Sequence, residues 1–188
     1  MDIDALRLEA IKDKIPVLSQ SGLEFLLRII RENKYKSFLE IGSAYGTTSL
    51  IISEEQTIQN VVGIEKDLKR FSKSLENLQK VDITSKVSFI NDDALNVTFD
   101  TKFDVIFIDA SKANYQKFFD HFKDNLNNGG VIICDNMNFH GLLENPRGSK
   151  RLLKMLLKLK AFKEKLATYK TEFYDIGDGM SVTKYENL

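Results

Sequence analysis

The sequence has little cysteine, no long apolar run and no net charge. Cys134 is the single cysteine among 188 residues, which excludes an internal disulfide and is typical of a protein in a reducing cytoplasm. No apolar run approaches the roughly 20 residues of a membrane span. Residues 1–14 carry acids and lack the apolar stretch of a signal peptide. We therefore expect a cytoplasmic protein without membrane contact.

Repeats, low-complexity stretches and interdomain linkers are also missing from the sequence. We therefore expect a single domain over residues 1–188, long enough to bury roughly two-thirds of its unfolded surface. Within it, residues 1–35 are expected to form a helical segment that covers the site. Residues 36–188 are expected to form the core of the domain.

The formal net charge of zero conceals a segregation of charge along the chain. Residues 147–170 hold nine Lys and Arg against one acid, whereas residues 171–188 hold one Lys and four acids. A basic segment of this kind favours an anionic partner. It is equally typical of a solvated helix face in a lysine-rich protein, and both interpretations stay open.

Apolar runs alternate with helical patterns from residue 21 onward. The runs are continuous rather than alternating, which is typical of parallel strands buried on both faces. They predict strands at residues 37–41, 61–65, 87–91, 103–109 and 129–135. The helical patterns predict helices at residues 21–33, with Ser21 as N-cap, and at about 47–54, 68–80 and 114–126. This order predicts a doubly wound α/β sheet.

The C-terminal part of the chain follows a different pattern. After the basic helix, residues 169–176 and 180–185 flank Gly177-Asp178-Gly179, which is a hairpin signal. We therefore expect a C-terminal antiparallel hairpin on a sheet that is otherwise parallel.

The stretch FLEIGSAYGTTS (38–49) predicts a strand, a glycine turn and a helix. A dinucleotide loop needs G-x-G-x-x-G, whose middle glycine lets the backbone approach a pyrophosphate. Three other residues separate Gly42 from Gly46, so this triplet is absent. Glu65, 23 residues past Gly42 at the end of the next strand, is placed to hold the hydroxyls of a ribose or, alternatively, to cap the following helix. NAD stays compatible, but S-adenosylmethionine, a nucleoside cofactor without phosphates, suits the loop better.

Polar residues end every predicted parallel strand. At two of these strand ends, side-chain oxygens could bind a metal ion. Asp109 follows the fourth strand, and Asp135 and Asn136 follow the fifth. Oxygen ligands without His or Cys suit a hard cation such as Mg²⁺ or Mn²⁺. The alternative is that Asp135 and Asn136 only turn the chain.

The chain resembles the metal-dependent class I O-methyltransferases, the family that includes catechol and caffeoyl-CoA O-methyltransferases. The resemblance spans roughly residues 14–185 and rests on LEIGSAYGTTSL, VVGIEKD, NDDAL, FDVIFIDASKANY, GGVIICDNMNFHG and GDGMSV. It implies a Rossmann-like methyltransferase sheet, S-adenosylmethionine as cofactor, and Mg²⁺ or Mn²⁺.

The resemblance also implies roles for individual residues. The divalent-metal ligands correspond to Asp109, Asp135 and Asn136, and the catalytic pair to Lys112 and Asp109. The expected cofactor contacts are Val17, Glu40, Gly42, Thr48, Glu65, Asp93, Ala94 and Asp109. Two positions depart from the family pattern, because Asp92 replaces a frequent glycine and Ala110 is a small residue beside the first metal ligand.

In this family, methyl transfer is an in-line displacement by a substrate oxygen. Lys112 is expected to take the proton of that oxygen, because a nearby cation and the sulfonium disfavour a third positive charge and lower the lysine pKa. The alternative for Lys112 is a solvated lysine at a helix start. His140 follows Asn136 closely and is a candidate for substrate contact, or else an ordinary loop histidine.

Two acceptors are compatible with the sequence: small catechol-like phenols, and a wobble 5-hydroxyuridine in the tRNA anticodon region. Four basic residues at the start of the basic segment can neutralise several phosphates and favour RNA: Arg147, Lys150, Arg151 and Lys154. The stretches IPVL, FIDASKANYQKFFD, FHGLL and GDGMSVTK most resemble bacterial tRNA 5-hydroxyuridine methyltransferases. Against RNA, the leucines of the same helix must serve packing or a dimer contact, and we expect a homodimer. A cofactor-binding module without catalysis is a further alternative, which the intact set of Lys112 and metal ligands disfavours.

Overall fold

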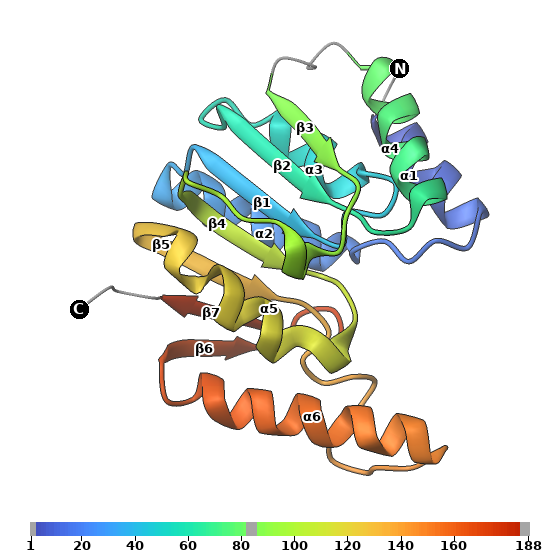
Figure 1. Cartoon of the computed structure of the whole chain (residues 1–188), viewed down its shortest axis with the longest axis vertical. Helices are drawn as coiled ribbons and strands as arrows, with labels where there is room; N and C mark the ends of the chain where they lie inside the picture. Colours follow the sequence, from blue (N-terminus) through green and yellow to red (C-terminus); the bar gives the residue numbers. More distant parts are fainter. Residues whose placement is uncertain (1–2, 82–85, 185–188) are drawn as a thin grey trace.

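The structure is a computed structural model that describes residues 3–81 and 86–184. Within these residues, one sheet of seven strands has the order β3-β2-β1-β4-β5-β7-β6 (Figure 1). The parallel strands are β1 (Ser37–Ile41), β2 (Asn60–Ile64), β3 (Val87–Ile90), β4 (Phe103–Ile108) and β5 (Leu126–Cys134). The antiparallel strands β6 (Lys170–Tyr174) and β7 (Met180–Lys184) form a hairpin, in which β7 pairs with β5. The expected fold class is confirmed.

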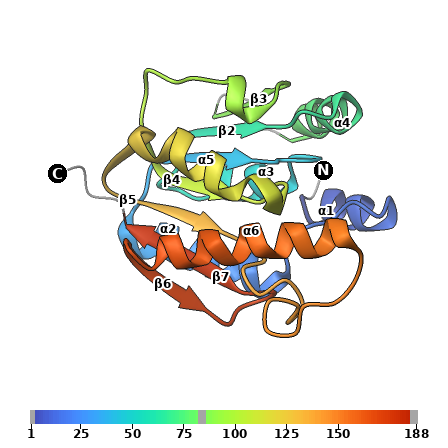
Figure 2. The same cartoon turned by 60° about the horizontal axis from the view of Figure 1, so that its bottom comes forward.

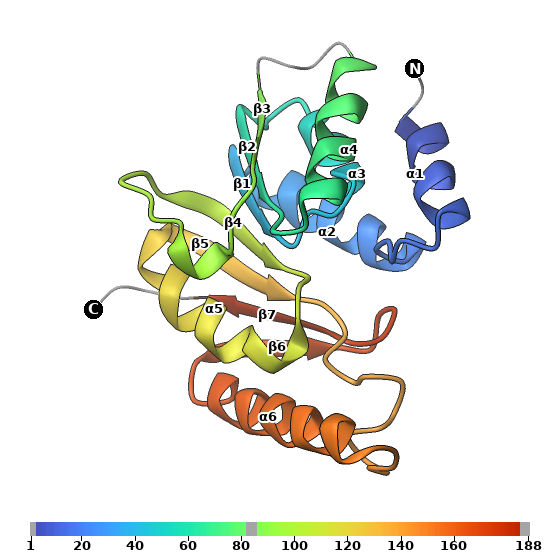
Figure 3. The ribbon, with the colours of Figure 1, turned by 45° about the vertical axis from the view of Figure 1, so that its right-hand side comes forward.

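Both faces of the sheet are covered by helices (Figure 3). One face carries α2 (Gln20–Asn33), α3 (Thr47–Ser53) and α4 (Leu68–Gln79), with α1 (Ile3–Lys12) outside them; the other carries α5 (Tyr115–Phe122) and α6 (Lys150–Leu166). Along β4, Val105 and Phe107 enter the first core, whereas Ile106 and Ile108 enter the second. All four side chains are buried, which explains why the strand is a continuous apolar run.

Several predicted boundaries differ from the structure by one or more residues, and two of these differences have a clear physical reason. Helix α2 begins at Gln20 because Ser19, and not Ser21, is its N-cap, and the Ser19 hydroxyl accepts the Gly22 N–H at 3.1 Å. Helix α5 ends at Phe122, and the 3₁₀ turn η3 (Lys123–Asn125) leads into β5 three residues earlier than residue 129. Residues 1–2 of the expected N-terminal segment and residue 185 of the expected last strand lie outside the described residues.

The five parallel strands end at one edge of the sheet, and short segments there carry the polar residues. They include the 3₁₀ turns η1 (Ala94–Asn96) after β3 and η2 (Lys112–Asn114) after β4. Helix α6 begins at this same edge (Figure 2). None of the helices in the described part of the chain is long and apolar enough to cross a membrane.

Candidate active site

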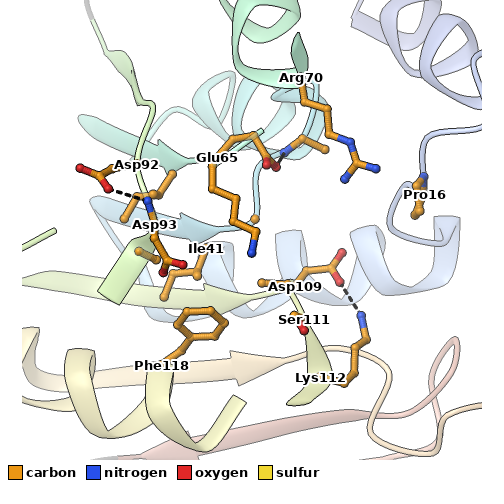
Figure 4. A pocket seen from close by; sticks show the side chains of 16 residues that line it. Pro16, Ile41, Glu65, Arg70, Asp92, Asp93, Asp109, Ser111, Lys112 and Phe118 are labelled. Atoms are coloured by element: carbon orange, nitrogen blue, oxygen red, sulfur yellow. Dashed lines mark hydrogen bonds and ion pairs between the residues drawn. The ribbon is translucent and has the colours of Figure 1, made fainter. Parts of the chain in front are cut away.

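A cavity of about 340 Å³ lies at the carboxyl ends of the parallel strands (Figure 4). Its lining comes from the segments that follow β1, β2, β3 and β4, and from Pro16 in the connection between α1 and α2. Six residues that the sequence predicted to form a site lie in this lining: Gly42, Glu65, Asp93, Ala94, Asp109 and Lys112.

The glycine turn at the end of β1 is shaped by contacts with its two neighbouring strands. The N–H groups of Gly42 and Ser43 both donate to the Ile64 carbonyl, at 2.9 and 3.1 Å. Gly42 has φ 92°, and a Cβ there would lie 2.4 Å from the carbonyl oxygen of Asp109. A side chain is therefore excluded at this position by conformation and by space.

Glu65 is buried and joins the glycine turn to helix α4. Its Oε2 accepts the Ala44 N–H at 2.9 Å, and its Oε1 accepts the Asp67 N–H at 2.8 Å. The second of these bonds agrees with the helix-capping interpretation. Because each carboxylate oxygen can accept a further hydrogen bond, Glu65 can also bind a ligand hydroxyl in the cavity that it lines.

The segment after β3 closes the same end of the cavity. Asp93 caps η1 by accepting the Leu95 N–H at 3.1 Å. Asp92, which replaces the frequent glycine, also lines the cavity, and its Oδ1 accepts the Asp93 N–H at 2.7 Å. Ala94 is buried beside them.

Three lining residues had no signal in the sequence. Lys66 directly follows Glu65, and Phe118 reads as an ordinary core residue of α5. Arg70 extends from α4 over the cavity, into the space between Glu65 and Pro16 (Figure 4). Lys66 lies in the connection before α4, whereas Arg70 and Phe118 come from helix faces, so their place in the site depends on how α4 and α5 pack.

Glu40, Thr48 and Val17, which were expected to contact the cofactor, do not line the cavity. Glu40 is buried and accepts bonds from both the N–H and the hydroxyl of Ser49 at the start of α3. Burial raises the pKa of Glu40 to about 8, and the negative charge of Asp109 adds to the rise. Thr48 is buried beside it, and Val17 adjoins Pro16 of the lining.

Asp109 and Lys112 meet at the end of the cavity formed by β4. The Lys112 Nζ lies 3.2 Å from Asp109 Oδ1, and both side chains are about four-fifths buried, with exposed fractions of 18% and 23% (Figure 4). Nζ also lies 5.5 Å from the centre of the Tyr115 ring. The Tyr115 hydroxyl donates to the Asp135 carbonyl, and burial raises the pKa of Tyr115 well above its ordinary value, so the hydroxyl keeps its proton.

Asp135 and Asn136 lie beside this pair, because Ile108 of β4 is in register with Cys134 of β5. Asp135 is buried, and its pKa is raised to about 7, chiefly by burial and then by the negative charge of Asp109. Among residues 3–81 and 86–184, no three His, Cys, Asp or Glu side chains gather in a way that could hold a metal ion. Two mutually repelling carboxylates next to an amide nevertheless have the donor chemistry that suits Mg²⁺ or Mn²⁺.

His140 lies in the loop after β5 and has an exposed side chain. Its N–H donates to Asp178 Oδ1 at 2.6 Å, and its ring Nδ1 lies 3.5 Å from Asp178 Oδ2. The turn of the hairpin is docked on this loop, because Met137 and Asn138 donate to the carbonyls of Gly179 and Asp178. His140 does not line the cavity.

The four basic residues expected to contact RNA are all exposed, and none of them lines the cavity: Arg147, Lys150, Arg151 and Lys154. Arg147 lies just before α6, and the other three lie in its first turns, at the carboxyl edge of the sheet (Figure 2). The buried face of α6 consists of Leu156, Leu159, Phe162 and Leu166, and the last three pack into the core that also contains α5. The basic face of the helix is therefore distinct from its packing face.

A doubly wound sheet with a cavity at its carboxyl edge defines an α/β enzyme that binds a nucleotide or nucleoside. Residues 4–185 match the family described as O-methyltransferase, and the chain belongs to this family. It is 26% identical over 185 residues to a proposed caffeoyl-CoA O-methyltransferase of Arabidopsis thaliana, an alignment that covers 91% of this chain and 77% of that protein. The expected enzyme class, an S-adenosylmethionine-dependent O-methyltransferase, is confirmed.

Solved structures show the same fold. A proposed caffeoyl-CoA O-methyltransferase from Staphylococcus aureus has a TM-score of 0.89 at 30% identity, and the match covers 97% of this chain and 91% of that one. The methyltransferase PaMTH1 of Podospora anserina, solved with bound SAH, has a TM-score of 0.87 at 24% identity, covering 100% and 89%.

Proposed function

We propose that this O-methyltransferase transfers the methyl group of S-adenosylmethionine to the 5-hydroxyl of a wobble 5-hydroxyuridine in tRNA, and that a divalent cation assists the transfer. The observation that carries the choice of acceptor is the exposed basic start of α6, on the same edge of the sheet as the cavity. Residues Arg147, Lys150, Arg151 and Lys154 can neutralise phosphates of the RNA backbone there.

The residues at one end of the cavity would bind the cofactor, and those at the other end would act on the acceptor. Glu65 would accept hydrogen bonds from the ribose hydroxyls of the cofactor, and Asp93 and Ala94 would lie against its adenine. Lys112, held next to Asp109, would accept the proton of the attacking hydroxyl. Confinement of the acceptor and the methyl donor in one cavity would align them for in-line displacement.

Asp109, Asp135 and Asn136 would hold the divalent cation. When bound, such a cation lowers the pKa of an acceptor hydroxyl and fixes its position. The protein's own contribution is the placement of two carboxylates at the ends of adjacent strands, where the charge of Asp109 disfavours the ionised state of Asp135. The amide of Asn136 would add a neutral oxygen to this set.

A small catechol-like phenol is the second candidate acceptor. It is favoured by the relatives named after caffeoyl-CoA and by the same oxygen-donor set, which could receive two adjacent hydroxyls. Nothing in the basic face of α6 would serve such a substrate.

Transfer of labelled methyl groups tests the proposal. The acceptors are tRNA that contains 5-hydroxyuridine, the same tRNA with unmodified uridine, and 3,4-dihydroxybenzoate, each with Mg²⁺ and with a chelator. We expect label only in the hydroxyuridine tRNA, and only with Mg²⁺. Labelling of the catechol alone would overturn the tRNA acceptor, whereas full activity in chelator would overturn the role of the cation.

A further inference from the structure

Tyr115 is the first residue of α5 and the last of the stretch FIDASKANY, and the function proposed above gives it no role. Its side chain is fully buried, and it does not line the cavity. A buried tyrosine could serve the core alone, as its neighbour Phe119 does. The contacts of Tyr115 differ from those of Phe119 in a way that concerns the reaction.

The Tyr115 side chain contacts groups that follow both β4 and β5. The Tyr115 hydroxyl donates to the Asp135 carbonyl at 3.0 Å, and its ring centre lies 5.5 Å from Lys112 Nζ. The ring is held in turn by Phe162 of α6, edge to face, with 6.1 Å between ring centres. Tyr115 thus contacts the segment after β4, the end of β5 and α6.

The hydrogen bond to Asp135 lies where the chain leaves β5. Asn136, the next residue, has φ 55°, so the backbone turns sharply between the two expected metal ligands. A fixed bond on the carbonyl at this turn limits the directions in which Asp135 and Asn136 can point. The buried carbonyl would lose its partner if the hydroxyl were removed.

The ring acts on the other strand end. An ammonium group within about 6 Å of an aromatic ring centre is attracted to the ring face. Because Lys112 Nζ also lies 3.2 Å from Asp109 Oδ1, the ring and the carboxylate together restrict where the ammonium can go. Lys112 would otherwise be a flexible side chain next to an open cavity.

We infer that Tyr115 is a positioning residue that fixes Asp135 through its hydroxyl and Lys112 through its ring. This inference rests on the roles proposed above for Lys112 and Asp135. It adds a group outside the cavity whose removal disturbs Lys112 and Asp135 and leaves the expected cofactor contacts around Glu65 and Asp93 intact.

Tyr115→Phe keeps the ring and removes the hydroxyl, so it tests the bond to Asp135 with little risk to folding. We expect kcat to fall about tenfold, because a small displacement of a reacting group costs rate, while the dissociation constant for SAH stays unchanged. A second readout needs no turnover. The amides of residues 137–141, several of which are hydrogen-bonded in the structure, should exchange hydrogen about tenfold faster in the variant.

Phe119→Leu is the matched control, because Phe119 is an equally buried ring on the same helix and also packs on Phe162. It should lower stability without lowering kcat or exposing residues 137–141. Two results in Tyr115→Phe would each overturn the inference: unchanged exchange at these amides, or a loss of SAH affinity equal to the loss of kcat. Comparable losses in Phe119→Leu would do the same.

Lys112→Ala, measured alongside, separates this inference from the proposed function. If Lys112→Ala turns over normally, the proposed mechanism fails. If it is inactive while Tyr115→Phe behaves like the wild type, only the role of Tyr115 fails. If the wild type methylates neither the hydroxyuridine tRNA nor 3,4-dihydroxybenzoate, the proposed acceptors fail, and amide exchange still decides whether Tyr115 holds the turn.

Discussion

At the end of the cavity that follows β1, β2 and β3, carboxylates are held by backbone N–H groups, whereas at the end that follows β4, beside the end of β5, charged side chains act on one another. Glu65 accepts two backbone N–H bonds, and Asp93 accepts one. Asp109, in contrast, is paired with the ammonium of Lys112, and its charge raises the pKa of Asp135. The first end (the cofactor end) is fixed by the fold itself. The second (the reaction end) depends on contacts between charged side chains.

This difference has consequences for function. Carboxylates that backbone N–H groups already hold in place can bind a ligand with little rearrangement, so the cofactor end is suited to affinity. Like charges at the reaction end are unfavourable until a cation or proton joins them, so this end is suited to chemistry that begins only when its partners arrive. Mutations at the two ends should therefore separate binding from turnover.

Removal of the proposed proton acceptor should give the largest effect. In Lys112→Ala we expect kcat to fall by about a thousandfold, the range typical of a lost general base, with SAH affinity retained. Single-turnover transfer and calorimetric SAH binding measure the two quantities. Lys117→Ala, an exposed lysine on the adjacent helix, is the control. An equal loss of affinity and turnover would mean that Lys112 is structural.

The reverse pattern is expected at the cofactor end. Glu65→Gln keeps the shape of the side chain but replaces one acceptor oxygen by an amide donor that faces a backbone N–H. We expect SAH to bind more weakly by about 2 kcal/mol, roughly thirtyfold, with kcat at saturating cofactor little changed. Asp67→Asn is the control, because Asp67 caps α4 without lining the cavity. If that variant lost as much affinity, the capping interpretation of Glu65 would be the better one.

Smaller effects are expected on the basic face of α6, outside both ends. In Arg151→Ala and Lys154→Ala, the KM for hydroxyuridine tRNA should rise a few-fold, and the salt dependence of binding should weaken by about one ion per lost phosphate contact. Turnover of a catechol, if any, should not change. Lys36→Ala, an exposed residue just before β1 and so at the opposite edge of the sheet, should leave the KM for tRNA unchanged. If Lys36→Ala raised the KM for tRNA equally, the basic face of α6 would contribute only through the overall charge of the protein and not as a specific binding surface.

The sequence predicted the two ends unequally well, for physical reasons. Continuous apolar runs located the parallel strands, and the polar residues after them had to meet at one edge, which brought Gly42, Glu65, Asp93 and Asp109 into one cavity. Which serine caps α2 could not be read, because Ser19 and Ser21 carry the same local signal. Arg70 and Phe118 could not be found, since a helix residue reaches a cavity only through the packing of its helix.

Glu40 links the two ends and should have the smallest effect on activity, because its effect is on stability. It is bonded to Ser49 at the start of α3, while the charge of Asp109 contributes to raising its pKa from 4.5 to about 8. Between these values the native state keeps a proton that the unfolded chain has released. Native protein therefore binds more protons, and stability should fall as the pH rises from about 4.5 to about 8, by at most about 1.4 kcal/mol per pH unit.

Urea unfolding of metal-free protein between pH 5 and 8 measures this slope. Glu40→Gln cannot titrate and should flatten it, although Asp135 contributes in the same direction and leaves part of the slope. Glu54→Gln, an exposed acid at the end of α3, should have no effect. In Asp109→Asn the loss of stability should still begin near pH 4.5, because the unfolded chain sets this limit. It should end at a lower pH than in the wild type, because the pKa of Glu40 falls when the neighbouring charge is removed. An unchanged profile in Asp109→Asn would show that the cofactor end and the reaction end are electrostatically independent.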